Sequence, residues 1–174
     1  MSKIPDDVIT QDSMNLRSMC NVAYANAMRF IDKYSGYGVG VVLEVRYGYD
    51  SQEYTETYTA HNIRLSGIQF AMHAEQLAGF NALMDISKLS DPTDATLERI
   101  VIVTTGNDMA VNCGHCMQVL KSICGYTETD TSKFTIIGAD RSEEDEETNP
   151  IWNIQRATLD EFMGDTYVKN RDRS

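Results

Sequence analysis

Long apolar runs are missing from this sequence, and their absence excludes two classes of protein. No stretch of its 174 residues approaches the roughly 20 consecutive apolar residues that a membrane-spanning helix needs. The N-terminal stretch MSKIPDDVITQDS lacks the apolar core of a secretory signal peptide. We therefore expect an intracellular, cytoplasmic protein with no membrane partner.

Cysteines and basic residues are also scarce. Four cysteines are too few for a disulfide scaffold, and in a reducing compartment a close pair more often binds metal or is catalytic. Fifteen bases against 26 acids give a net charge of −11, which argues against nucleic acid as the main partner but is compatible with a local basic groove. The acidity is equally consistent with adaptation to high salt and with an ordinary acidic protein kept soluble by its charge.

The remaining composition is that of a globular protein, with 42% hydrophobic and 24% charged residues, and we expect one domain over residues 1–174. Apolar residues recur at helical spacing over residues 14–32, which predicts an amphipathic first helix. The β-rich stretch 38–45 and the alternating Tyr/Thr stretch 54–63 predict an antiparallel hairpin, with a long loop over 48–54.

The rest of the chain alternates helix and strand. Residues 68–86 have the pattern of a buried helix, and residues 99–105 and 133–140 have the β-branched composition of buried strands. The candidates for the core face of the 68–86 helix are Met72, Leu77, Phe80 and Leu83. This order of elements predicts a sheet with a parallel portion and helices packed on it.

Three further segments complete the pattern. The helix that the cysteine segment opens lies between the two buried strands. Residues 141–150 predict an acidic surface loop, and residues 151–155 predict a last strand. Residues 158–167 predict a short terminal helix.

The stretch Cys113-Gly114-His115-Cys116 has two interpretations. A Cys-x-x-Cys pair at the start of a helix has a lowered thiol pKa, which suits thiol exchange. In thioredoxin-like proteins a tryptophan usually precedes the pair, whereas here Asn112 precedes it and the single tryptophan lies downstream. The dithiol interpretation is weakened but stays open, and we expect His115 to point away from the pair.

The second interpretation is half of a zinc site. His73 lies near the start of its own predicted helix, and in a β-α-β-α layout the starts of both helices lie near the same sheet edge. His73 can therefore meet Cys113 and Cys116 there, and three protein ligands with an open fourth position are typical of catalytic zinc. Glu75 follows His73 by two positions and can move protons without binding the metal. The combination matches the pattern of zinc deaminases.

These motifs resemble those of the cytidine deaminase family of pyrimidine salvage. YSGYGVGVVL resembles the family's Tyr-Ser-x-Phe-x-Val-Gly segment, and MHAEQLAGFNAL resembles its Cys/His-Ala-Glu helix. NCGHCMQVL resembles its Pro-Cys-Gly-x-Cys-Arg-Gln helix, and TLDEFMGDTY is similar to its C-terminal Leu-Leu-Pro-x-x-Phe motif. AHNIR resembles its Asn-x-Glu element, at the spacing from Asn62 to His73 that is usual in the small-subunit forms.

The resemblance implies an α/β fold with three α-β-α layers and a mixed sheet of about five strands. It also implies a homo-oligomer, with a tetramer favoured, and one zinc ion per subunit held by His73, Cys113 and Cys116. The implied reaction is hydrolytic deamination of cytidine or deoxycytidine to uridine or deoxyuridine. Water would attack C4 of the base, and Glu75 would assist the loss of ammonia.

The resemblance assigns substrate contacts as well. Ala74 would offer its backbone to the pyrimidine, Tyr37 would line the base pocket, and Asn62 would bind the ribose. Tyr167 would reach the site of a neighbouring subunit. The cytosine nucleoside and water would be the small-molecule partners.

The sequence departs from the family pattern at three positions. Asn112 replaces the proline before the first cysteine and can cap the helix instead. Met117 replaces an arginine, which is tolerable because one histidine and two thiolates against Zn²⁺ sum to zero charge. Arg64 replaces the ribose-binding glutamate of Asn-x-Glu.

Arg64 leaves the substrate open, because a guanidinium cannot accept a hydrogen bond from a sugar hydroxyl. It either grips a phosphate or carboxylate, as in a nucleotide or a modified cytosine compound such as a nucleoside antibiotic, or turns away to pair with a surface acid. Two alternatives of other classes also stay open: a dithiol oxidoreductase that uses Cys113 and Cys116, and a zinc-binding module without catalysis.

Overall fold

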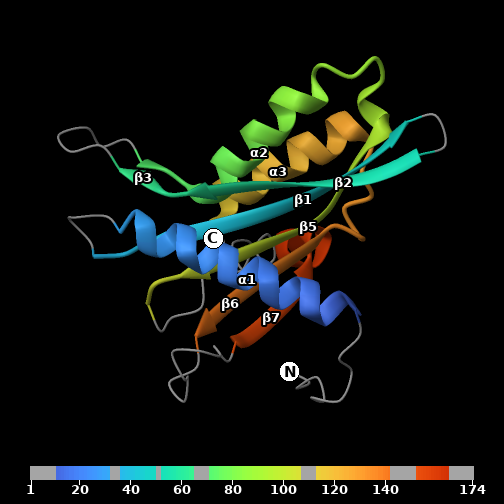
Figure 1. Cartoon of the computed structure of the whole chain (residues 1–174). Coiled ribbons are helices and arrows are strands. Elements are labelled where there is room, and N and C mark those ends of the chain that lie inside the picture. The colour runs from blue at the N-terminus through green and yellow to red at the C-terminus, as the bar shows by residue number, and fades with distance from the viewer. Residues whose placement is uncertain are drawn as a thin grey trace.

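The computed structural model of the chain describes residues 11–31, 36–49, 52–64, 71–106, 113–141 and 152–164 (Figure 1). In chain order its elements are α1 (Gln11–Arg29), β1 (Val39–Tyr49), β2 (Gln52–His61), β3 (Ile63–Arg64), β4 (Ala71–Met72), α2 (Ala74–Ile86), the short 3-10 helix η1 (Pro92–Asp94), β5 (Ala95–Thr104), α3 (Gly114–Thr127), β6 (Thr135–Arg141) and β7 (Trp152–Thr158). Residues 159–164 add a short helical segment. None of the described helices combines the length and apolar character that crossing a bilayer requires.

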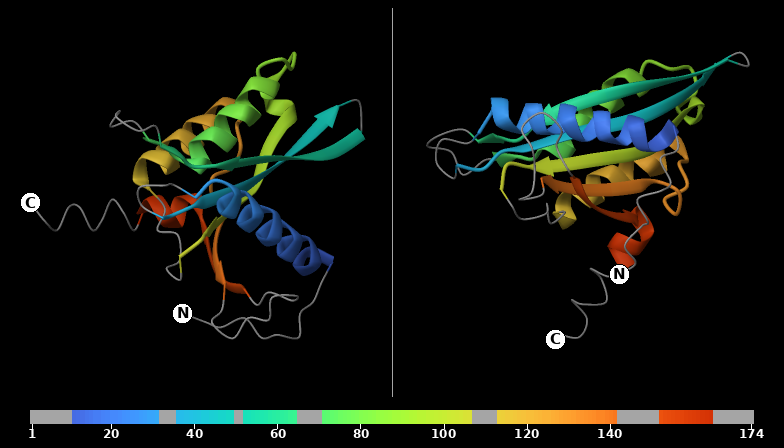
Figure 2. Two further views of the ribbon diagram at one scale, coloured as in Figure 1. Left: turned by 60° about the vertical axis from the view of Figure 1, so that its left-hand side comes forward. Right: turned by 60° about the horizontal axis from the view of Figure 1, so that its bottom comes forward.

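Five strands form one mixed sheet in the order β2-β1-β5-β6-β7. β5 and β6 are parallel, and the other neighbouring pairs are antiparallel. Helix α1 covers one face, whereas α2 and α3 lie side by side on the other (Figure 2). The predicted α/β class, with a mixed five-stranded sheet and helices on both faces, is confirmed.

Alternation along the strands divides the core into two apolar clusters. Val41 and Leu43 of β1 belong to the cluster under α2 and α3, and Val42 between them belongs to the cluster under α1. Cys20 and Cys124 are fully buried in these clusters, where each packs as a small hydrophobic side chain. Burial raises the pKa of each of these two thiols to about 12.

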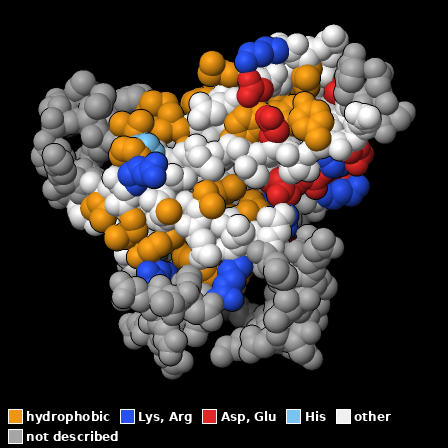
Figure 3. Space-filling view, in the orientation of Figure 1, with side chains coloured by type: hydrophobic (Ala, Val, Ile, Leu, Met, Phe, Trp, Pro, Cys, Tyr) orange, Lys and Arg blue, Asp and Glu red, His pale blue; other side chains and the backbone are white. Residues whose placement is uncertain are grey.

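Helix α1 begins three residues before the predicted 14–32 segment and ends at Arg29. Apolar periodicity marks only the part of a helix that the sheet covers, so it sets helix ends poorly. Helix α1 exposes the apolar side chains of Val22 and Met28, and Phe30 directly after the helix is exposed as well, each by more than two-fifths. In Figure 3 hydrophobic side chains follow α1 across this face, while acidic ones gather nearer the β1–β2 hairpin.

The predicted core face of the helix over residues 68–86 is only partly correct, because Leu77 and Leu83 pack against the core cluster whereas Phe80 and Met72 do not belong to a buried face of this helix. The helix starts only at Ala74, Met72 lies in β4, Leu77 and Leu83 are partly buried, and Phe80 is 41% exposed. Small side chains are buried instead, because α2 packs closely against both the sheet and α3. At Gly79 a Cβ atom would lie 3.0 Å from the Ile123 Cδ1 atom of α3.

The loop predicted over 48–54 is mostly paired strand. The β1–β2 register continues to the pair Tyr49–Gln52. Tyr47 and Tyr54 stack with ring centroids 5.2 Å apart, and Arg46 Nη1 lies 2.8 Å from Glu53 Oε1. These cross-strand contacts hold the strands together to the end of the hairpin. Of the predicted acidic loop 141–150, only Arg141 lies within the described residues, where it ends β6.

A candidate metal centre at the helix starts

Two helix starts meet at the carboxyl end of β5. Helix α2 packs on the sheet, and its last residue leads through residues 87–94 into the start of β5. The first residue of α2 therefore lies near the carboxyl end of β5. Helix α3 follows β5 and starts near the same end before leading into the parallel strand β6. The sequence therefore brings two helix N-termini, with their free amide groups, to one edge of the sheet.

Each helix start carries candidate metal ligands. His73 is the N-cap residue of α2, and its backbone N–H donates to Gln76 Oε1 over 3.4 Å. Cys113 is the N-cap residue of α3, and Cys116 lies in the first turn of that helix. Gln76 is a supporting residue that sequence reasoning missed, although a glutamine three positions after an N-cap is a known capping signal.

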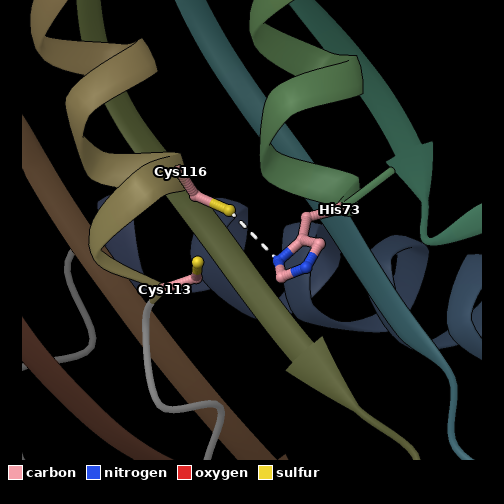
Figure 4. A group of neighbouring side chains, drawn as sticks. All are labelled: His73, Cys113 and Cys116. Carbon is pink, nitrogen blue, oxygen red and sulfur yellow. Dashed lines mark hydrogen bonds between the residues drawn. The ribbon is translucent and has the colours of Figure 1, made fainter. Parts of the chain in front are cut away.

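The three side chains converge as Figure 4 shows. His73 Nδ1 lies 3.2 Å from Cys116 Sγ. The ligand atoms of His73, Cys113 and Cys116 all lie within 4.8 Å of one another, so they could hold a metal ion. Imidazole nitrogen and thiolate sulfur are the donors that zinc prefers, and three such donors leave room for a fourth ligand. The donor set thus fits zinc.

Glu75 lies beside these ligands in the first turn of α2 and is only 5% exposed. Cys116 is fully buried. Burial raises the pKa of the Cys116 thiol, and the charges of Glu75 and Cys113 and hydrogen bonds with both raise it further. A cation between these groups would offset the negative charge that two sulfur ligands and a carboxylate bring to a poorly solvated place.

Asn62 and Tyr37 lie at the same edge of the sheet. Asn62 Oδ1 accepts a hydrogen bond of 2.8 Å from the Val39 backbone N–H, and the Asn62 N–H donates to the Val39 carbonyl. The Asn62 side-chain amide also donates to the Tyr37 carbonyl over 3.5 Å. Asn62 therefore joins the end of β2 to the start of β1. Ile63 pairs with Met72, so Asn62 and His73 flank the same strand pair.

The other residues singled out from the sequence are placed less completely. Ala74 is fully buried as the first residue of α2, and Met117 is fully buried in α3. The backbone of Arg64 pairs with Ala71, two positions before His73, but its side chain lies outside the described residues. Asn112 and Tyr167 lie outside them too, and the predicted capping role of Asn112 was wrong, because Cys113 is the N-cap residue of α3. His115 is exposed.

Solved structures with the same architecture are cytidine deaminases. The enzyme from Burkholderia pseudomallei matches with a TM-score of 0.57 and 16% sequence identity, over 84% of this chain and 94% of that chain. The enzyme from Mycobacterium tuberculosis matches with a TM-score of 0.51 and 18% identity, over 84% of this chain and 91% of that chain. The chain therefore has a cytidine deaminase-like fold.

The likeness lies in structure and not in overall sequence. No family model matches the chain, and no curated protein matches it. At 16% and 18% identity, the likeness establishes a shared fold but no shared reaction. The reaction has to be inferred from the residues at the candidate metal centre.

Proposed function

We propose that this protein is a zinc-dependent hydrolase that removes the amino group from the cytosine base of a nucleoside. The observation that carries the proposal is the convergence of His73, Cys113 and Cys116 beside the buried carboxylate of Glu75. Zinc-dependent deamination of cytosine requires one nitrogen and two sulfur ligands for the metal. It also requires a nearby carboxylate that does not bind the metal and transfers protons.

In this proposal His73 Nδ1 and the two sulfur atoms hold the zinc ion, which would supply Lewis acidity that makes water a stronger nucleophile. Glu75 accepts a proton from the water that attacks C4 and delivers it to the departing amino group. The overall change exchanges the C4–NH₂ group of cytosine for a C4 carbonyl and releases ammonia. Burial of Glu75 keeps bulk water from competing for that proton.

The groups around this centre would bind the rest of the substrate. The backbone of Ala74 at the start of α2 would contact the pyrimidine, because the first amides of a helix have no acceptor within it. Tyr37 would line the base pocket, and Asn62 and Tyr167 would complete the site. Since the Asn62 amide already bonds to Val39 and Tyr37, its role includes shaping the pocket edge.

We further propose one zinc ion per subunit, a cytoplasmic role in pyrimidine salvage and a single domain over the whole chain. We also propose a homo-oligomer, with a tetramer favoured, in which the exposed apolar side chains of Val22 and Met28 on α1 would offer apolar surface to another subunit. Nucleic acid is not expected as a partner, given the net charge of −11.

The substrate could be a nucleotide or a nucleoside antibiotic instead of cytidine or deoxycytidine, because Arg64 stands where the family has a carboxylate. The positively charged guanidinium group of an arginine attracts phosphate and carboxylate groups and can bind them with two parallel hydrogen bonds. The backbone position of Arg64, across the strand pair from Ala71 and close to His73 in the chain, keeps this alternative within reach of the site.

Ammonia release from a panel of cytosine compounds tests both the reaction and its substrate. Wild type and Arg64→Glu are compared on cytidine, deoxycytidine and CMP at matched zinc content. If Arg64 binds a phosphate, wild type prefers CMP, and Arg64→Glu shifts the preference toward the nucleosides. Equal turnover of CMP by both proteins would reject a phosphate contact, and release of ammonia from none of a wide panel would reject the deaminase.

A further inference from the structure

We propose that Cys113 and Cys116 are also a site of reversible oxidation, at which a small-molecule disulfide such as oxidised glutathione closes them into an intramolecular disulfide. The inference rests on the proposed function in one respect, because a bound metal would compete for the same two sulfur atoms. It follows from the placement and the unequal exposure of the two thiols.

The two sulfur atoms are close enough to join. Cys113 is the N-cap residue of α3 and Cys116 lies in its first turn, and their sulfur atoms lie within 4.8 Å of each other. A disulfide needs a separation of about 2.05 Å, so the remaining gap is within the range that rotation about the Cα–Cβ bonds covers.

The two thiols differ in access from outside. Cys113 is partly exposed, whereas Cys116 is fully buried. The intervening residues Gly114 and His115 are exposed, and a Cβ atom built on Gly114 would meet none of the described atoms within 4 Å. A bulky disulfide can therefore approach Cys113 past Gly114, while Cys116 stays shielded from direct attack.

The difference in exposure between the two thiols sets the order of the two exchange steps. The Cys113 sulfur attacks oxidised glutathione, which forms a mixed disulfide with Cys113 and releases one reduced glutathione. The Cys116 sulfur then attacks Cys113 Sγ, forms the internal disulfide and releases the second reduced glutathione. Two thiols of the protein are oxidised, one glutathione disulfide is reduced, and both protons leave with the released thiols.

A bound metal and the disulfide exclude each other. Metal ligation uses the same electron pairs on Cys113 and Cys116 that the exchange reaction uses, and a disulfide sulfur is a poor ligand for zinc. Oxidation of the pair would leave His73 as the sole remaining member of the three-residue group. The pair would therefore release metal under oxidising conditions and recover its binding capacity on reduction.

The test uses the double variant Cys20→Ala/Cys124→Ala, in which Cys113 and Cys116 are the only remaining cysteines. Metal-free and zinc-loaded samples of the full chain are incubated with oxidised glutathione. Free thiols, released zinc and peptide masses are then followed. We expect the metal-free sample to lose both thiols and to yield a peptide with a Cys113–Cys116 bond that reductant restores. Zinc loading slows the loss, and oxidation of the loaded sample releases its zinc.

Variants of the pair separate the two steps. Cys116→Ala should accumulate the mixed disulfide at Cys113, whereas Cys113→Ala should keep its buried Cys116 thiol reduced. A metal-free protein that retains both thiols, or that stops at a mixed disulfide with Cys116 present, would overturn the proposal. Ammonia release by the zinc-loaded protein is measured separately, so the deaminase and the oxidation site can fail independently.

Discussion

At the scale of single residues, the described structure gives Asn62 a second role beside the one expected from its motif. Its side chain accepts from the Val39 N–H and donates to the Tyr37 carbonyl, so it orders the start of β1 next to the candidate site. The Val39 N–H is a backbone group 23 positions away from Asn62. Every residue except proline has such a group, so the sequence does not indicate which one the Asn62 side chain contacts. The motif could therefore predict Asn62 as important but not this bond.

Asn62→Ala should lower the free energy of unfolding by about 1–3 kcal/mol, because the partly buried Val39 N–H loses its acceptor. Asn62→Asp keeps the acceptor for the Val39 N–H but loses the donor to the Tyr37 carbonyl, so it separates the contribution of the first bond from that of the second. Urea denaturation of the two variants measures the difference. An Ala variant as stable as wild type would show that the bond contributes nothing to folding.

His61 should make the stability of the protein depend on pH. Its ring stacks on Phe30 with centroids 3.6 Å apart, and burial, aided by the charge of Arg29, lowers its pKa below the usual value of 6.5. The unfolded chain therefore takes up a proton more readily than the folded one. The neutral His61 ring makes its full contribution to the free energy of unfolding above about pH 6.5, and this contribution is lost as the pH falls below that value.

Denaturation of wild type and His61→Phe in the presence of a chelator, which removes metal effects, checks this dependence between about pH 7 and pH 5. The Phe variant keeps a ring against Phe30 and cannot titrate, so its stability should fall less over this range. Parallel curves for the two proteins would assign the pH dependence to other groups.

At the scale of helices and strands, the packing of α1 depends on a glycine. A Cβ atom on Gly40 of β1 would collide with the Ala23 carbonyl oxygen and would lie 2.7 Å from the Ala27 backbone nitrogen, both in α1. These are backbone atoms, so the helix would have to move away from the sheet. The glycine thus sets the distance between two layers of the fold.

Gly40→Ala should destabilise the protein by about 2–3 kcal/mol through overpacking. Gly125→Ala is the matched control, because its Cβ atom would meet none of the described atoms within 4 Å and would lie in α3. The control should be neutral or stabilising by up to about 1 kcal/mol. Thermal unfolding of both variants compares them, and equal melting temperatures would contradict close packing at Gly40.

Element type could be predicted from the sequence, whereas the direction of a helix face could not. The β-branched runs predicted β5 and β6, and the helix starts predicted that His73 would meet Cys113 and Cys116. The face of α2 was misjudged because large apolar side chains were taken as its core. Close approach of α3 at Gly79 selects small side chains there and leaves Phe80 outside.

At the scale of the whole molecule, a bound metal would join two helices that are far apart in the chain. His73 precedes α2 and the cysteines begin α3, so the ion would link segments separated by about forty residues. A ligand that binds only the folded state raises its stability by mass action, by about 4 kcal/mol at a thousandfold excess over Kd.

Chelation should therefore lower the Tm of the zinc-loaded protein by on the order of 10 °C. Cys116→Ser lacks one ligand and should unfold at a temperature that hardly responds to the chelator. Calorimetry of both proteins with and without chelator makes the comparison. A wild-type Tm that is equally insensitive would count against metal binding at the helix starts.

The central claim, deamination assisted by Glu75 at this centre, is tested most directly by the rate of ammonia release from zinc-loaded wild type and Glu75→Gln. Gln has nearly the shape of Glu but cannot carry the proton. With equal zinc content in the two proteins, we predict that the rate with the preferred cytosine compound falls by about 10²–10⁴-fold in the variant. An unchanged rate in Glu75→Gln would contradict the account.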